Sequence, residues 1–143
     1  MPIRLAPYAG EPEAGDPAYA GEWADGLAVM RGEVQTPPWC SYLARRDGDI
    51  VGMCGFKGAC TDGVVEIGYI TFFPARGRGV ATEAAGLLVD IAREHGATAV
   101  RAHTMHEASA STRGLEANGF TRVASVLDPQ DGPVWRWERS LAA

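Results

Sequence analysis

The chain has 143 residues, of which 46% are hydrophobic and 22% are charged, and its formal net charge is −5. This length and composition predict one globular domain, residues 1–143, with a core of its own. The acidic balance argues against nucleic acid as a partner, because binding to a phosphate backbone needs a basic surface. We find neither an apolar run long enough to cross a membrane nor a secretory leader, so we expect a cytoplasmic protein without a membrane partner.

The first forty residues are predicted to be the least regular part of the chain. Six of the nine prolines lie there, and proline removes a backbone donor and interrupts regular hydrogen-bond ladders. We therefore expect loops and short helices around one helical piece near Tyr19 to Met30. Five acidic residues and no basic residue stand between Arg4 and Arg31, for which a solvated acidic face is the simplest interpretation.

Three β-runs are predicted next, two within residues 40–58 and one over residues 62–73. The first two meet at Asp47-Gly48, a dipeptide that accepts the positive φ angles of a tight hairpin. Asp62-Gly63 leads into the third run.

The apolar periodicity then changes from that of a strand to that of a helix. Apolar residues recur at spacings of three and four: Val80, Ala81, Ala84, Leu87, Leu88 and Ile91. His95 and Gly96 end the predicted helix, because a histidine complements the C-terminal dipole and a glycine tolerates the left-handed cap.

The rest of the chain alternates between strand and helix patterns. We predict a strand over residues 97–105, a short helix over 109–118 that ends at Gly119, and two strands over 120–128 and 133–141. Strands therefore come before, between and after two helices, which predicts a mixed α+β fold.

Two glycines and two arginines, Arg76-Gly77-Arg78-Gly79, stand where the third β-run gives way to the helix. A helix N-terminus has backbone donors without partners inside the helix and carries partial positive charge. Glycines let the backbone come close to a ligand, and the arginines and the Thr82 hydroxyl add to the site. The segment predicts a cradle for an anion, with a plain strand-to-helix turn as the alternative. It matches neither the dinucleotide-binding nor the phosphate-loop pattern.

Three segments, in the same order, resemble the GNAT superfamily of N-acetyltransferases. Residues 76–81, RGRGVA, fit the R-x-x-G-x-A form of its acetyl-CoA signature, within the similar stretch VEIGYITFFPARGRGVATEA. Residues 110–120, ASTRGLEANGF, resemble its N-x-A-S-x-R-x-L-E-K-x-G-F segment. The final strand, GPVWRWE, is similar to that of the branch of ribosomal-protein-alanine acetyltransferases. The resemblance covers roughly residues 39–140.

The resemblance implies the GNAT fold, a mixed and mostly antiparallel central sheet that splays between its fourth and fifth strands and is flanked by helices. It also implies acetyl-CoA as the cosubstrate, whose acetyl group passes directly to an amine with no covalent enzyme intermediate. The coenzyme would contact Ile70, Thr71 and Phe72 with its pantetheine arm, Arg76, Gly77, Arg78, Gly79, Val80, Ala81 and Thr82 with its pyrophosphate, and also Ser109.

An amine must lose a proton before it attacks, and similar enzymes often place a glutamate base at the position of Glu66. His103 is the second candidate, because residues 101–107 would face the same cleft. Each has a simpler interpretation, Glu66 as a solvated strand residue and His103 as a hydrogen-bonded core residue. We predict no metal, because His103 and His106 would point to opposite faces of a strand and the three cysteines lack metal-ligand spacing.

Two departures from the family pattern concern the coenzyme and the leaving thiolate. Ser109 takes the place of an asparagine that commonly bonds the coenzyme. Leu115 stands where many members carry a tyrosine that protonates the thiolate. Ser111 or a water is our candidate acid, and the thiolate can also leave with little help because a thiol is already acidic.

Three functions compete on the sequence alone. The first is an acetyl-CoA-dependent N-acetyltransferase acting on a primary amine of a small molecule or on a peptide N-terminus. The second is an acyl-CoA-binding regulatory or sensor module with weak or lost turnover, which Ser109 and Leu115 keep open. The third is an interaction domain without a cofactor.

The acceptor is the least defined part of the prediction. In this fold the early helices often border the acceptor site, so the acidic residues before Arg31 would attract a cationic amine. Trp23, Trp39 and Tyr42 would either line that pocket or pack in the core, and we expect two of the three in the core. The identity of the amine, the acyl-chain preference and the oligomeric state, for which a homodimer is one option, stay open.

Overall fold

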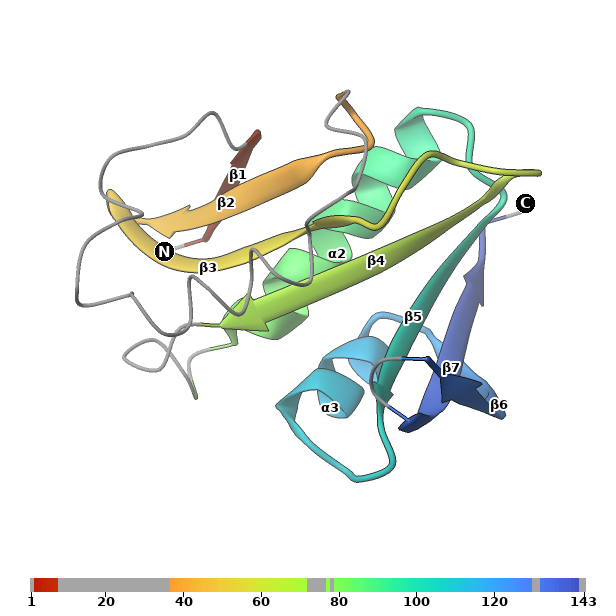
Figure 1. The fold of residues 1–143 in the computed structure, drawn as a ribbon. Coiled ribbons are helices and arrows are strands. Elements are labelled where there is room, and N and C mark those ends of the chain that lie inside the picture. The colour runs from red at the N-terminus through yellow and green to blue at the C-terminus, as the bar shows by residue number, and fades with distance from the viewer. Residues whose placement is uncertain (1, 8–36, 72–76, 78, 130–131, 142–143) are drawn as a thin grey trace.

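The computed structural model describes residues 2–7, 37–71, 77, 79–129 and 132–141. Within them, seven strands form one sheet in the order β1-β2-β3-β4-β5-β7-β6 (Figure 1). The strands are β1 (Arg4–Pro7), β2 (Ser41–Arg46), β3 (Asp49–Phe56), β4 (Val64–Thr71), β5 (Ala99–Met105), β6 (Thr121–Asp128) and β7 (Gly132–Ser140), and the described helices are α2 (Val80–Glu94) and α3 (Ala110–Ala117). The helix expected near residues 19–30, and the acidic residues of that region, lie outside the described residues.

Strand β1 corrects the prediction that the chain start contains only loops and short helices. It pairs antiparallel with β2, from Arg4 opposite Arg45 to Pro7 opposite Tyr42. Its local sequence carries no strand signal, and the pairing depends on the edge that β2 offers. Pro7 is tolerated because it ends a strand at the edge of the sheet.

The β2–β3 hairpin forms as predicted. Asp47 and Gly48 have φ angles of 53° and 87°, the two positive values that a tight two-residue turn needs. Asp62 and Gly63, before β4, also have positive φ angles.

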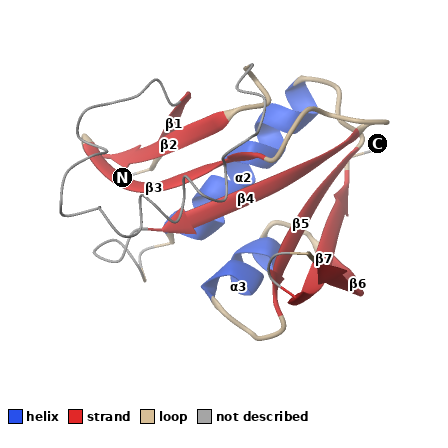
Figure 2. Cartoon of the chain, in the orientation of Figure 1, coloured by secondary structure: helices blue, strands red, loops and turns tan. Residues whose placement is uncertain are grey.

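Helix α2 packs on β3 and β4 with one apolar face (Figure 2). Its buried residues are Val80, Ala84, Ala85, Leu88, Val89 and Ala92. The predicted end is confirmed, since His95 is the C-cap and its Nδ1 lies 2.9 Å from the Ile91 carbonyl oxygen. Gly96 follows with a φ of 87°. No helix among the described residues is long and apolar enough to span a membrane.

Helix α3 is fixed at both ends by side-chain hydrogen bonds. Ser109 Oγ accepts from the Thr112 amide at 3.3 Å, and Thr112 Oγ1 accepts from the Ser109 amide at 2.9 Å, which is a capping box. At the other end, Asn118 Nδ2 donates to the Thr82 carbonyl at 2.9 Å and to the Gly114 carbonyl at 2.8 Å. Asn118 therefore ties α3 to the first turn of α2.

The aromatic residues of the first half lie in or against the core where they are described. Tyr42 is buried, and Trp39 packs edge-to-face on Phe56 with ring centroids 5.0 Å apart. Core packing of two of the three residues is therefore confirmed, and Trp23 lies outside the described residues.

The sheet separates between β4 and β5, which form its parallel pair. Their pairing runs only from Val64 opposite Ala99 to Ile67 opposite Ala102. Beyond that point β4 continues along β3, and β5 continues along β7 as far as Met105. All other strand pairs are antiparallel, so the predicted mixed sheet with a splay at this place is confirmed.

Candidate active site

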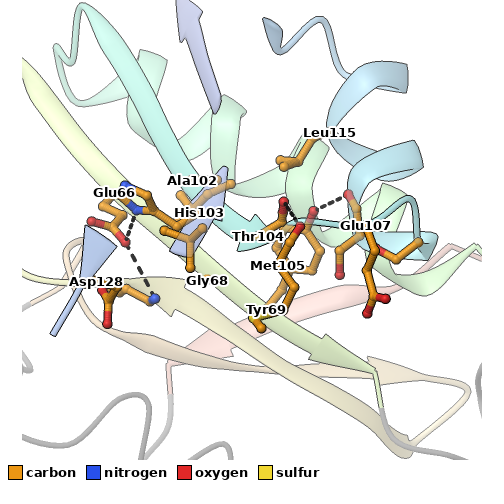
Figure 3. Close-up of a pocket in the computed structure, with 15 residues that line it drawn as sticks. Glu66, Gly68, Tyr69, Ala102, His103, Thr104, Met105, Glu107, Leu115 and Asp128 are labelled. Carbon is orange, nitrogen blue, oxygen red and sulfur yellow. Dashed lines mark hydrogen bonds and ion pairs between the residues drawn. The ribbon is translucent and has the colours of Figure 1, made fainter. Parts of the chain in front are cut away.

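The separation of β4 and β5 opens a cleft of about 360 Å³ (Figure 3). Glu66 and Tyr69 line it from β4, His103 lines it from β5, and Leu115 lines it from α3. The same cleft thus contains both residues that were predicted as candidate bases.

Glu66 and His103 form one hydrogen-bonded unit. His103 Nδ1 lies 3.0 Å from Glu66 Oε2, and Arg136 Nε donates to His103 Nε2 at 3.1 Å. A guanidinium can only donate, so Nε2 is the acceptor and Nδ1 carries the proton that is shared with Glu66. His103 is therefore a neutral imidazole here with both ring nitrogens engaged. The sequence predicted Glu66 and His103 as two separate candidate bases, whereas in the structure they are hydrogen-bonded to each other.

Only one carboxylate oxygen of Glu66 is engaged by the described residues. Its Oε2 takes the bond from His103 and lies 3.5 Å from Lys57 Nζ. In the described part of the chain, no bond or ion pair engages Oε1. The side chain is 29% exposed, so it is half-buried yet open to a ligand.

A second cavity, of about 490 Å³, lies at the N-terminus of α2. Gly77 and Gly79 have φ angles of 80° and 76°, in the left-handed region that favours glycine. A methyl group added at either glycine would meet no atom within 4 Å, so both Cα atoms face open space. The predicted residues that line this cavity are Gly77, Gly79, Val80, Ala81, Thr82 and Ser109.

The backbone of β4 beyond Ile67 has one open edge. Ile70 pairs with Met53 and Thr71 with Gly52 on the β3 side, whereas pairing with β5 stops at Ile67. In the described sheet, the other edge of this segment therefore has no strand partner and can bond a ligand. The other predicted coenzyme contacts, Phe72, Arg76 and Arg78, lie outside the described residues.

Tyr69, Ser109 and Ser111 line both cavities and mark the place where they meet. The Tyr69 hydroxyl donates to the Ser111 carbonyl at 2.9 Å, and burial raises the pKa of the Tyr69 phenol. The sequence prediction missed Tyr69. Strand alternation places it on the same face as buried Val65 and Ile67, and a phenol at such an inward position was the available signal.

Among the described residues, no group of three or more His, Cys, Asp or Glu side chains is placed to hold a metal ion. His106 Nε2 lies 2.8 Å from Ser125 Oγ, and its ring stacks on Trp135, away from the unit of His103 and Glu66. Cys54 is fully buried, and burial raises the pKa of its thiol, so it is a core residue.

A family model described as an acetyltransferase (GNAT) domain matches residues 5–121. The chain belongs to the GNAT acetyltransferase family. In contrast to this family match, no curated protein is significantly similar to the chain in sequence.

Solved structures share the fold of this GNAT acetyltransferase at low sequence identity. AAC(6')-Ib in complex with ribostamycin and coenzyme A is 18% identical with a TM-score of 0.73, over 99% of this chain and 94% of that chain. A GNAT-family acetyltransferase from Bacillus anthracis is 14% identical with a TM-score of 0.75, over 98% of this chain and 95% of that chain. RimL, a ribosomal alpha-N-protein acetyltransferase in complex with coenzyme A, is 18% identical with a TM-score of 0.63, over 70% of this chain and 60% of that chain. They confirm the predicted fold.

The chain departs from the GNAT pattern at two positions near the site. Counted from Ala110-Ser111, the asparagine of the N-x-A-S segment falls on Ala108, so its assignment to Ser109 was one residue too late. Ser109 caps α3 and also lines both cavities, and it stays a predicted coenzyme contact. Leu115, at the tyrosine position, is fully buried and lines the cleft with an aliphatic side chain.

Proposed function

We propose that this GNAT acetyltransferase transfers an acetyl group from acetyl-CoA directly to a primary amine of a small molecule or to a peptide N-terminus. The observation that carries the proposal is the junction of two cavities. One holds a glycine-rich helix N-terminus suited to an anion, and the other holds a carboxylate paired with an imidazole. Tyr69, Ser109 and Ser111 join them, so one extended ligand can reach from the first to the second.

The coenzyme would bind from the helix toward the cleft. Gly77, Gly79 and the first-turn amides of α2 receive the pyrophosphate, with Arg76 and Arg78 adding charge. The pantetheine arm follows the open edge of β4 at Ile70 and Thr71, where backbone groups replace the missing strand. The thioester then lies where the two cavities meet.

Glu66 is our proposed base. Glu66 lines the cleft and its Oε1 atom has no partner among the described residues, whereas both nitrogens of His103 are engaged. The carboxylate takes a proton from the amine, whose nitrogen then attacks the carbonyl carbon of the thioester. His103 acts through Glu66 as a positioning residue, because its bond to Oε2 fixes the direction of Oε1.

The charge of the cleft favours a cationic acceptor. Glu107 and Asp128 line it together with Glu66, and Lys57 is paired with Glu66. An ammonium group would be attracted before it loses its proton. AAC(6')-Ib, bound to ribostamycin, and RimL, a ribosomal alpha-N-protein acetyltransferase, are neighbours consistent with an amine acceptor in either class.

Binding and turnover test the proposal in two steps. Acetyl-CoA at 100 times its Kd should raise the free energy of unfolding by roughly 2.7 kcal/mol, visible as a thermal shift. Thiol release across a panel of small amines and peptides, with intact-mass detection of the acetylated product, then identifies the acceptor. A thermal shift without thiol release on any amine would favour the acyl-CoA-binding module, and no shift would remove the coenzyme from the proposal.

A further inference from the structure

The structure also bears on how the thiolate leaves. At the family's tyrosine position, Leu115 is an aliphatic side chain that cannot give a proton. Tyr69 lines the same cleft from β4, on the side opposite the α3 residue (Figure 3). We propose that Tyr69 is a catalytic residue that donates its phenolic proton to the sulfur of the leaving thiolate. This inference rests on the proposed function and concerns the same site.

The position of Tyr69 is the first argument. A coenzyme that runs from the cradle into the cleft must pass the residues that line both cavities, which are Tyr69, Ser109 and Ser111. Of these three side chains, only Tyr69 has a phenol, and a phenol is a much stronger acid than the alcohol of a serine. Tyr69 is therefore a better proton donor than Ser111, the residue that the sequence predicted as the acid.

The hydrogen bond of Tyr69 is the second argument. Its hydroxyl donates to the Ser111 carbonyl at 2.9 Å, and this bond holds the ring across the gap between β4 and α3. A hydroxyl hydrogen can rotate to another acceptor at the same site. When negative charge develops on the sulfur, a charged acceptor replaces a neutral carbonyl, and the bond becomes stronger.

The proton balance of the step is closed. The amine nitrogen bonds to the carbonyl carbon, the carbon–sulfur bond breaks, and its electron pair goes to sulfur. Glu66 takes one proton from the ammonium and releases it to solvent before the attack, and it takes the second from the nitrogen once the tetrahedral intermediate has formed. Tyr69 protonates the sulfur, and the second proton returns from Glu66 to the phenolate through water. The products are an amide, a thiol and one proton in solvent. Burial raises the pKa of the Tyr69 phenol, which keeps it protonated and also makes it a weaker acid. The same burial disfavours a free thiolate, so the environment shifts the donor and the acceptor of the proton in the same direction.

A purely structural role for Tyr69 is the competing explanation, and the chain offers a matched control for it. The Tyr42 hydroxyl donates to the Pro38 carbonyl at 2.7 Å, and burial raises its pKa in the same direction. Tyr42 lies in the core and lines neither of the two cavities. Tyr42→Phe thus removes a phenol–carbonyl bond of the same kind as Tyr69→Phe does, together with the side-chain hydrogen bond between Tyr42 and Cys40, so its structural cost should be at least as large.

The test compares kcat and the Kd of acetyl-CoA in these two variants. Tyr69→Phe should lower kcat about 100-fold and leave the Kd of acetyl-CoA within about threefold of the wild-type value. The expected loss is at the lower end of the range for general acid–base catalysis, because a thiolate is already a fair leaving group. Tyr42→Phe should leave both unchanged. A Tyr69→Phe enzyme with wild-type kcat would overturn the proposal.

A second variant separates acid catalysis from packing, and decides the question if Tyr69→Phe does not fold. Replacement of Tyr69 by difluorotyrosine keeps the shape of the ring and makes the phenol more acidic. A general acid fails once it is deprotonated, so the alkaline limb of kcat should move to lower pH. The other titratable groups that line the cavities stay the same: Lys57, Glu66, His103, Glu107, Arg113 and Asp128. Superimposed pH profiles would rule the phenol out as the donor.

The outcomes also separate this inference from the function on which it rests. If the wild-type protein releases no thiol with any amine, the proposed function fails first. If the wild type is active and the Tyr69 variants match it, the function stands and only the role of Tyr69 is wrong.

Discussion

Gly79 offers a direct test of the anion cradle, because the same backbone strain can be placed at a control site. Gly79 and Gly48 have φ angles of 76° and 87°, and a methyl group at either would meet no atom within 4 Å. Alanine at each position should therefore cost about the same, roughly 1–2 kcal/mol for an L-residue in the left-handed region. Of these two glycines, Gly79 lines the cavity at the N-terminus of α2 and Gly48 does not.

The two variants should differ in ligand binding. The methyl group of Gly79→Ala projects into the space proposed for the pyrophosphate, and a Kd raised about tenfold corresponds to about 1.4 kcal/mol. At a concentration of 100 wild-type Kd, acetyl-CoA should then stabilise Gly79→Ala by only about 1.4 kcal/mol, against about 2.7 for the wild type and for Gly48→Ala.

Thermal unfolding with and without acetyl-CoA, and calorimetric titration, measure both quantities. Without ligand, both variants should unfold about 3–8 °C below the wild type. Equal ligand-induced stabilisation of Gly79→Ala and the wild type would refute the cradle, whatever their stabilities.

Three further predictions concern the base, the packing and the pH range. Glu66→Gln should lower kcat by roughly 100-fold or more, mainly at low pH where the amine is protonated, and should leave the Kd of acetyl-CoA unchanged. The control is Glu138→Gln, which removes a paired carboxylate of similar exposure outside the cleft and should keep full kcat. Gly55→Ala should destabilise the fold by about 3 kcal/mol in urea unfolding, because its methyl group would lie 2.5 Å from the Cys40 carbonyl oxygen and 2.8 Å from Ser41 Cα; a loss below about 1 kcal/mol would contradict this packing. Burial raises the pKa of the Cys54 thiol from its ordinary 9.0, so above that pH the unfolded chain loses a proton that the folded chain keeps, and the free energy of unfolding should fall as the pH rises. The Cys54→Ala variant should show a shallower fall between pH 9 and 10. Equal slopes for the variant and the wild type would contradict the assignment.

Local signals predicted the elements of the C-terminal two thirds of the chain well. Turn residues such as Asp47-Gly48 and the apolar spacing of residues 80–91 act over a few positions, so they can be recognised without knowing the fold. Strand β1 was missed for the opposite reason. Its four residues form a strand because β2 presents a free edge, and that edge lies about forty residues away in the sequence.

The candidate site likewise has one part that local sequence predicts and one part that depends on contacts between distant segments. Motif spacing and residue type are local properties, and they were enough to predict the glycine-rich turn before α2, the family, and Glu66 and His103 as candidate bases. Three features could be seen only once the chain was folded: the hydrogen bond between Glu66 and His103, the bond from Arg136 to the second ring nitrogen of His103, and the place of Tyr69 where the two cavities meet. These contacts join β4, β5, β7 and α3, and their geometry depends on where the parallel pairing of β4 and β5 stops. No pattern within one segment encodes that point, since it results from how all the strands pack together.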